Sequence, residues 1–314
     1  MNRLATVAIA LVATLTVEAQ TPGARNSHVL VSAGAGNGVL LFGGATNSSP
    51  RIVDTVWRWN GAAWQPLATD GPHSRSLPAA ALDSRRGVVV LYGGNGSGSA
   101  TRYGDTWEWD GQRWTERNVR TPGARDHHAM AFDEARGKVV MFGGLVGTTL
   151  ARDTWTWDGT TWTFADSTTG PVAVGHHAMA YDSRRQRIVM YGGAPASGPR
   201  LSDTWEWDGV KWERIATVGG PGPRSHHRMA YDAQRGEVVL FGGGDTTSTD
   251  TWTYDGRMWT RHSVASPSPR WSSAMAYDSD RKRVILFGGS QNARPYAALG
   301  DTWEWDGERW SRKQ

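Results

Sequence analysis

The chain has 314 residues, 39% of them hydrophobic and 20% charged, and a formal net charge of +4 at pH 7. It contains 39 glycines and 18 tryptophans but no cysteine, which describes a turn-rich globular chain with a large core and excludes disulfides and thiol chemistry. The basic residues recur at fixed positions and in turns. A nucleic-acid binder would concentrate them in a stripe with interleaved aromatics, so we expect no nucleic-acid partner.

Residues 1–19 are predicted to be a secretory signal. Asn2 and Arg3 precede an apolar run, residues 4–17, and small residues around Ala19 form a cleavage site. The alternatives are a buried first strand or a membrane anchor, but the run is too short to span a bilayer comfortably and lies outside the repeats described below. We therefore expect an exported protein, secreted or periplasmic, without stable membrane insertion.

From residue 20 to the end, one sequence unit is repeated six times. Its clearest mark is a pair of glycines that recurs every 46 to 50 residues. The pairs are Gly43-Gly44, Gly93-Gly94, Gly143-Gly144, Gly192-Gly193, Gly242-Gly243 and Gly288-Gly289. A fixed period of this length is the signature of a repeat architecture.

Each unit is predicted to form four antiparallel strands, A to D. In the third copy the corresponding segments are residues 125–133, 138–144 and 153–159 and the segment that begins at Trp162. The segments are short, rich in β-branched and aromatic residues, and bounded by glycine or aspartate. Such a unit cannot bury both faces of its sheet alone, so the units must stack on one another. The expected fold is an all-β six-bladed β-propeller with blades at about 21–69, 70–119, 120–168, 169–217, 218–264 and 265–314.

Three finer expectations follow from the repeat. The Asp110-Gly111 pair predicts a two-residue hairpin, in which Trp109 faces Gln112 and Trp107 faces Trp114. The first tryptophan of each Trp-x-Trp segment, Trp107 and its equivalents, is predicted to be buried between blades. Each blade is predicted to come from one contiguous segment, and blades 6 and 1 to meet by side-chain packing alone.

The glycine pair, the aromatic pair and the lone tryptophan resemble the kelch repeat of galactose-oxidase-like propellers. Val174, Tyr254 and Asn60 depart from the pattern of the other copies. Galactose oxidase activity is excluded, because its copper site requires a tyrosine crosslinked to cysteine. The resemblance also extends to the bacterial sialic-acid epimerase, which would imply a cofactor-free sugar isomerase or mutarotase. No B–C loop carries an evident glutamate for that chemistry, so we expect a binding protein without a cofactor.

The two faces of the predicted propeller differ. A–B and C–D turns share one face, the turn face, and are nearly uniform Asp-x-x-Arg and Asp-Gly turns. B–C and D–A connections share the other, the loop face. The B–C loops differ in every blade: 45–53, 95–104, 145–152, 194–202, 244–249 and 290–300. Variable loops on a rigid frame are where recognition resides. We expect a monomeric module that binds a glycan or a protein through the loop face.

A ring of arginines is predicted on the loop face, just before each strand A. Its members are Arg25, Arg75, Arg125, Arg224 and Arg270. One interpretation is that each arginine bonds loop carbonyls or an aspartate of the scaffold. The other is an anion site for a carboxylated sugar or an acidic peptide, because arginine binds carboxylates through two hydrogen bonds.

Histidine pairs occupy the next two positions in blades 3, 4 and 5. The second members, His128, His177 and His227, together with His28, are predicted to be structural residues packed between blades. The first members, His127, His176 and His226, are predicted to line the channel mouth as ligand-binding residues. A zinc site formed by these three is the less favoured alternative, because ligation requires convergence on one ion at about 2.1 Å.

Overall fold

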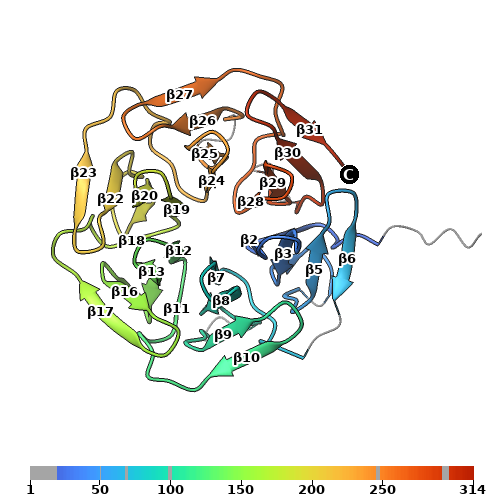
Figure 1. Ribbon diagram of the computed structural model, residues 1–314, viewed down its shortest axis with the longest axis horizontal. Coiled ribbons are helices and arrows are strands. Elements are labelled where there is room, and N and C mark those ends of the chain that lie inside the picture. The colour runs from blue at the N-terminus through green and yellow to red at the C-terminus, as the bar shows by residue number, and fades with distance from the viewer. Residues whose placement is uncertain (1–19, 50, 68–69, 98–100, 245–247, 292–296) are drawn as a thin grey trace, which may run out of the picture.

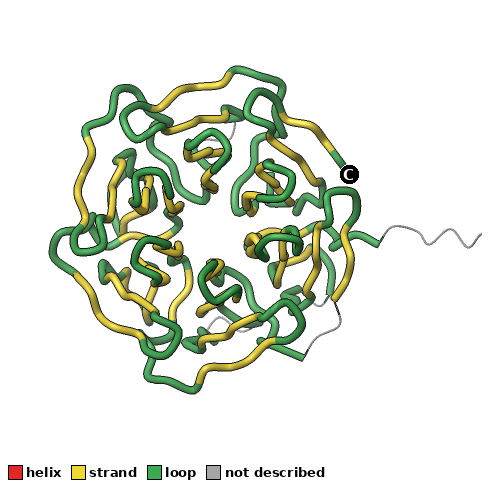
Figure 2. Tube along the Cα trace, viewed as in Figure 1, coloured by secondary structure: helices red, strands yellow, loops and turns green. Residues whose placement is uncertain are grey.

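The computed structural model describes residues 20–314 except 50, 68–69, 98–100, 245–247 and 292–296. The predicted signal, residues 1–19, lies outside the described residues. Within the described part the chain forms six four-stranded antiparallel sheets, arranged like blades around a central axis (Figure 1). Strands and loops account for all of the described residues in Figure 2, and none of these is helical. The fold is thus the predicted six-bladed β-propeller.

The blades are numbered in chain order, and their strands run from the axis outward. Blade 1 consists of β2 (Val29–Ser32), β3 (Val39–Phe42), β5 (Val56–Trp59) and β6 (Trp64–Leu67). Blade 2 consists of β7 (Ala79–Asp83), β8 (Val88–Tyr92), β9 (Thr106–Trp109) and β10 (Trp114–Arg117). Blade 3 consists of β12 (Ala129–Asp133), β13 (Lys138–Phe142), β16 (Thr154–Trp157) and β17 (Trp162–Asp166). Blade 4 consists of β19 (Ala178–Asp182), β20 (Arg187–Tyr191), β22 (Thr204–Trp207) and β23 (Trp212–Ile215). Blade 5 consists of β24 (Arg228–Asp232), β25 (Glu237–Phe241), β26 (Thr251–Tyr254) and β27 (Trp259–His262). Blade 6 consists of β28 (Ala274–Asp278), β29 (Arg283–Phe287), β30 (Thr302–Trp305) and β31 (Trp310–Arg312).

Short strands on the loop face join some D–A segments to the B–C loop of the same blade. They are β1 (Arg25–Asn26) with β4 (Ala45–Thr46), β11 (Arg125–Asp126) with β14 (Leu145–Val146) and β15 (Thr149–Leu150), and β18 (Val174–Gly175) with β21 (Ala194–Pro195). The B–C loops therefore stand on the innermost segments of the propeller and surround its axis.

Ring closure follows the predicted connectivity but not the predicted contacts. Blade 6 ends with its own outer strand, and no strand is exchanged between the ends of the described chain. Main-chain hydrogen bonds nevertheless join blades 6 and 1, because Arg25 N donates to Leu299 O at 2.9 Å and Ser27 N donates to Ser272 O at 2.8 Å. The expectation of side-chain packing alone is wrong. Equivalent bonds cross the other interfaces, so closure repeats the general pattern.

The core between blades is built on the second aromatic residue of each third strand. These residues are 0–2% exposed: Trp59, Trp109, Trp157, Trp207, Tyr254 and Trp305. The prediction for Trp107 and its equivalents is wrong, because these indoles are only partly buried. Trp107 lies nearer the loop face, where its Nε1 donates to Asp105 at 2.8 Å.

The hairpin between the third and fourth strands also differs from the prediction. Trp114 pairs with Trp109, and Glu116 pairs with Trp107, so the loop has four residues, 110–113. The Asp110 carboxylate accepts hydrogen bonds from the main-chain N–H groups of Gln112 and Arg113, both at 2.9 Å. This side-chain cap favours the longer turn. Trp107, Trp109 and Trp114 do pack in one cluster, as expected for one sheet face.

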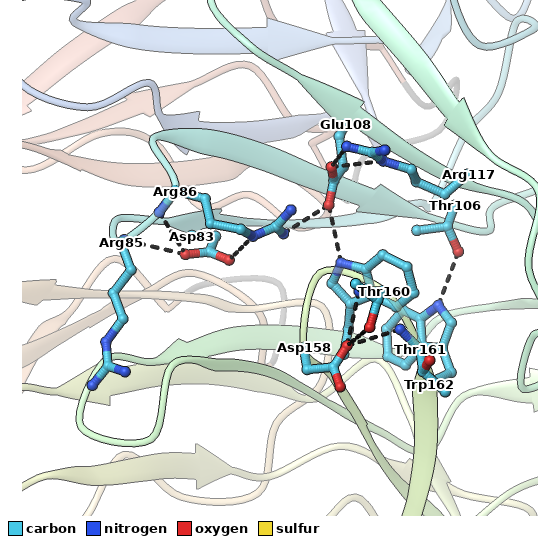
Figure 3. A network of polar contacts seen from close by, with 11 residues as sticks. Asp83, Arg85, Arg86, Thr106, Glu108, Arg117, Asp158, Thr160, Thr161 and Trp162 are labelled. Carbon is cyan, nitrogen blue, oxygen red and sulfur yellow. Dashed lines mark hydrogen bonds and ion pairs between the residues drawn. The ribbon is translucent and has the colours of Figure 1, made fainter.

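Neighbouring blades interlock on the turn face, as Figure 3 shows for blades 2 and 3. Asp83 accepts a bond from Arg86 Nε at 2.6 Å, and Arg86 reaches on to Glu108 at 2.7 Å. Glu108 also accepts the indole N–H of Trp157, in blade 3, at 3.0 Å. The Asp-x-x-Arg turn therefore links its own blade to the next one. The repeated charges of the turn face are used by the scaffold.

Candidate functional site at the channel mouth

Six equivalent residues with left-handed backbone frame the mouth of the axial channel on the loop face. They are Ser27, Leu77, His127, His176, His226 and Ser272, with φ between 52° and 61°. This conformation costs a non-glycine residue about 1–2 kcal/mol. Hydrogen bonds offset the cost, because His176 N donates to His127 O at 3.0 Å and His226 N donates to His176 O at 2.9 Å. The bonds continue through Ser272 and Ser27 to Leu77. They hold the mouth in a fixed shape.

The predicted arginine ring lies behind this frame and is part of the scaffold. The side chains of Arg25, Arg75, Arg125, Arg224 and Arg270 are 0–3% exposed. Arg75 donates to the carbonyl of Gly93 at 3.0 Å and forms two hydrogen bonds with Asp105, at 2.7 and 2.8 Å. Arg125 and Arg270 bind Asp153 and Asp301 in the same way. These contacts are the ones expected if each arginine bonds loop carbonyls or an aspartate of the scaffold.

Arg25 and Arg224 complete the set with a variation. Each donates to the first glycine carbonyl of its own pair, Gly43 at 3.0 Å and Gly242 at 3.1 Å, and to the carbonyl of a proline three residues earlier. The glycine pair and the arginine are thus one structural unit that joins the B–C loop to the D–A segment. The ring does not place its guanidinium groups at the mouth.

The predicted histidine trio does lie together at the mouth. The ring centroids of His127 and His176 are 3.9 Å apart with the planes at 73°, and those of His176 and His226 are 3.6 Å apart and stacked at 25°. The edge of this row is closed by Trp271, whose ring centroid lies 5.1 Å from that of His226. All three imidazoles are partly exposed, so they can contact a bound partner.

A buried carboxylate orients one end of the row. Asp126 is fully buried and accepts a hydrogen bond from His127 Nδ1 at 2.5 Å and another from Arg102 Nε at 2.8 Å. Burial alone would raise the pKa of Asp126, but its bonds to His127 and Arg102 and their charges hold the pKa below its usual value. Asp126 is therefore ionised at neutral pH and fixes the orientation of His127.

The other two imidazoles are neutral at neutral pH. Burial, followed by the charge of Arg228 and neighbouring imidazoles, lowers the pKa of His226 to about 3. Burial and the adjacent His226 and His127 lower the pKa of His176 well below its ordinary value. Neutral imidazoles both donate and accept hydrogen bonds. These two rings thus offer polar, uncharged contacts.

The three histidines do not form a metal site. Stacking turns the faces of His176 and His226 toward each other, whereas ligation requires ring nitrogens directed at one point. Over the part of the chain that the structure describes, no group of three histidine, aspartate or glutamate side chains could hold a metal ion.

The second histidines are structural, as predicted. His128 packs against Tyr92 of the preceding blade, with ring centroids 5.6 Å apart, and His177 packs against Phe142 in the same way at 5.5 Å. His28 and His227 repeat the contact with Phe287 and Tyr191.

The channel beneath the mouth contains two cavities. The upper one, of about 110 Å³, extends from the structural histidines to a ring formed by Leu30, Ala80, Met130, Met179, Met229 and Met275. The lower one, of about 310 Å³, extends from this ring to the turn face. Arg228 lines the upper cavity and was not predicted as a site residue. The sequence does distinguish this residue, because Arg228 stands where the other five copies have alanine or valine.

Six four-stranded blades around an axial channel, with variable loops on one face, define a repeat-built β-propeller. Residues 27–208 and 166–314 match the family model described as the KLHDC2/KLHL20/DRC7 Kelch-repeats domain. The chain therefore belongs to the kelch-repeat family. A comparison with curated proteins found no significant match. A search of the described residues found no helix long and apolar enough to cross a membrane.

Proposed function

We propose that this kelch propeller is an exported recognition module that binds a protein partner through its loop face. The observation that carries the proposal is the contrast between the two faces. On the turn face, repeated aspartates and arginines bond to one another and to the next blade. On the loop face, the row of His127, His176 and His226 breaks the repeat and stays partly exposed. Groups that serve no scaffold role are the ones available for recognition.

The chemistry of His176 and His226 favours polar, uncharged contacts at the mouth. The buried arginines offer no free cation there, and His176 and His226 are neutral. Aromatic rings with hydrogen-bonding edges, bordered by Trp271, are the residue types enriched at protein interfaces. Export is supported by the signal-like residues 1–19.

Site-specific photocrosslinking tests this proposal. A photoreactive phenylalanine analogue would replace His176 at the mouth or, as a matched control, Val210, which is 77% exposed on the turn face. After exposure to extracellular or periplasmic extract of the source cells, mass spectrometry should identify a protein joined to position 176 and not to position 210. Crosslinks from position 210 alone would contradict the proposal.

The same surface has a second candidate function, a cofactor-free sugar isomerase or mutarotase. The specific observation in its favour is the 2.5 Å bond between Asp126 and His127, since a carboxylate-oriented imidazole is a general acid–base pair. A glycan array followed by proton NMR of any bound sugar distinguishes the two functions. Turnover that is lost in His127→Gln would support the enzyme, and binding of a protein alone would support the recognition module.

A further inference from the structure

Among the described residues, one charged side chain lines the upper cavity of the axial channel, and it breaks the propeller symmetry. At the position of Arg228, the other blades have Val29, Ala79, Ala129, Ala178 and Ala274. Arg228 donates Nε to the carbonyl of Ser273 at 2.6 Å and Nη1 to the carbonyl of His227 at 3.1 Å. The small residues of the other blades leave open space opposite the guanidinium group.

Among the residues that the structure describes, none supplies an acidic partner to Arg228. No ion pair between described residues includes it, and its hydrogen bonds go to main-chain carbonyls. Burial lowers the pKa of Arg228 to about 10, so the group is protonated at neutral pH. Arg228 is only partly exposed, and a cation that has lost part of its hydration without gaining a counter-charge is costly. The site therefore favours an anion.

The cavity beside Arg228 has suitable size and lining. Its volume of about 110 Å³ exceeds the roughly 10–15 Å³ that one water molecule needs by this measure, so a small anion fits with some of its hydration. His128 lines the same cavity, and both of its buried ring nitrogens have no hydrogen-bond partner among the described residues. A neutral imidazole carries one N–H, which gives the lining of this cavity a second donor.

We propose that the upper channel cavity, bordered by Arg228 and His128, binds one small monovalent anion, a halide or a carboxylate the size of acetate. One cation lies in the cavity, so one negative charge neutralises it, whereas a dianion such as sulfate would leave a net buried charge. The site lies beneath the histidine row and does not depend on the proposed partner. It completes the interior of the propeller with a bound counter-ion.

Thermal unfolding at constant ionic strength tests this site. Sodium chloride or sodium acetate would replace sodium sulfate stepwise. The proteins compared are the wild type, Arg228→Met and Arg113→Met, and the last is a control that loses the same charge at an exposed position. The wild type and Arg113→Met should gain stability steadily as chloride increases, by about 100-fold in the folding constant at 100 times the dissociation constant. Arg228→Met should lack this gain. Equal responses in all three proteins would overturn the proposal.

A second measurement avoids dependence on the folding of Arg228→Met. The ³⁵Cl NMR line of chloride should broaden when the wild-type protein is added and should narrow again on addition of acetate, with one site per chain. A line that is unchanged by the protein, or broadening that acetate does not reverse, would overturn the proposal. Competition by sulfate as effective as that by acetate would overturn the assignment of a monovalent site.

Discussion

Trp162 donates its indole N–H to Thr106 Oγ1 of the preceding blade at 2.9 Å. An equivalent tryptophan–threonine bond is present at five of the six blade interfaces. The other four bonds join Trp64 to Thr302, Trp212 to Thr154, Trp259 to Thr204 and Trp310 to Thr251. The exception is the interface of blades 1 and 2. There Val56 occupies the threonine position, and the buried Nε1 of Trp114 has no partner among the described residues.

Val56→Thr should stabilise the protein. A buried, unsatisfied donor costs about 1–3 kcal/mol, and a new hydroxyl in the position of Thr106 supplies the acceptor. We expect the free energy of unfolding, measured by urea denaturation, to rise by about 1 kcal/mol. The mirror change, Thr106→Val, should lower it by about 1–3 kcal/mol by leaving Trp162 unsatisfied. A loss of stability in Val56→Thr would show that Trp114 is not accessible to that hydroxyl.

Arg75→Gln should destabilise the protein, because Arg75 belongs to the scaffold. The change removes two hydrogen bonds to the Asp105 carboxylate and one to the Gly93 carbonyl. Bonds to charged groups contribute about 1.5–3 kcal/mol each, so the melting temperature should fall by several degrees. Arg113→Gln, at an exposed position, is the control. Unchanged melting in both variants would restore the interpretation of the ring as a ligand site.

The blades could be predicted from the sequence because each repeat repeats its local signals. The glycine pair is one example: Gly43 has φ of 71°, and a Cβ there would lie 2.6 Å from the carbonyl oxygen of Arg75. Repetition in six copies identifies such requirements without a structure. The assignment of loop face and turn face followed from strand direction alone, and the antiparallel strand order in each blade agrees with it.

What the sequence could not predict depends on partners that are distant along the chain. Trp107 and Trp109 are two residues apart in one strand and therefore lie on the same face of the sheet. Only the neighbouring blade determines which of the two indoles is buried. The role of Arg75 depends on Asp105, 30 residues later. The proximity of His127 and His176 could be predicted from repeat positions, but the angle of their rings could not.

Trp157→Ala should be far more destabilising than Trp155→Ala. Trp157 is fully buried between blades and bonds Glu108, whereas Trp155 is partly exposed and bonds Asp153 beside it in the chain. Truncation of a fully buried tryptophan costs about 3–5 kcal/mol. Urea denaturation of both variants provides the comparison. Equal losses would mean that the partly exposed indole contributes as much to blade packing as the buried one.

Acidification should destabilise the protein below about pH 6.5, before its carboxylates titrate. Burial lowers the pKa of His128, His177 and His226 to about 3, and burial also lowers the pKa of His28, His176 and His227 well below the ordinary value. In the unfolded chain these groups have pKa values near 6.5. Between pH 6.5 and 3 the unfolded state therefore binds protons that the folded state does not, and stability falls as pH falls.

The slope of this loss counts the buried histidines. Each contributes up to about 1.4 kcal/mol per pH unit once its unfolded form is fully protonated. Urea denaturation at pH 7.5, 6.5, 6.0 and 5.5 should show a flat region above neutrality and then a steep decline. His128→Gln should reduce the slope by about one proton, because it removes one group that titrates only in the unfolded state. Val210→Gln, at an exposed position without a titratable group, should leave the slope unchanged. Stability that is constant down to pH 5.5 would mean that the interior histidines accept protons without unfolding the propeller.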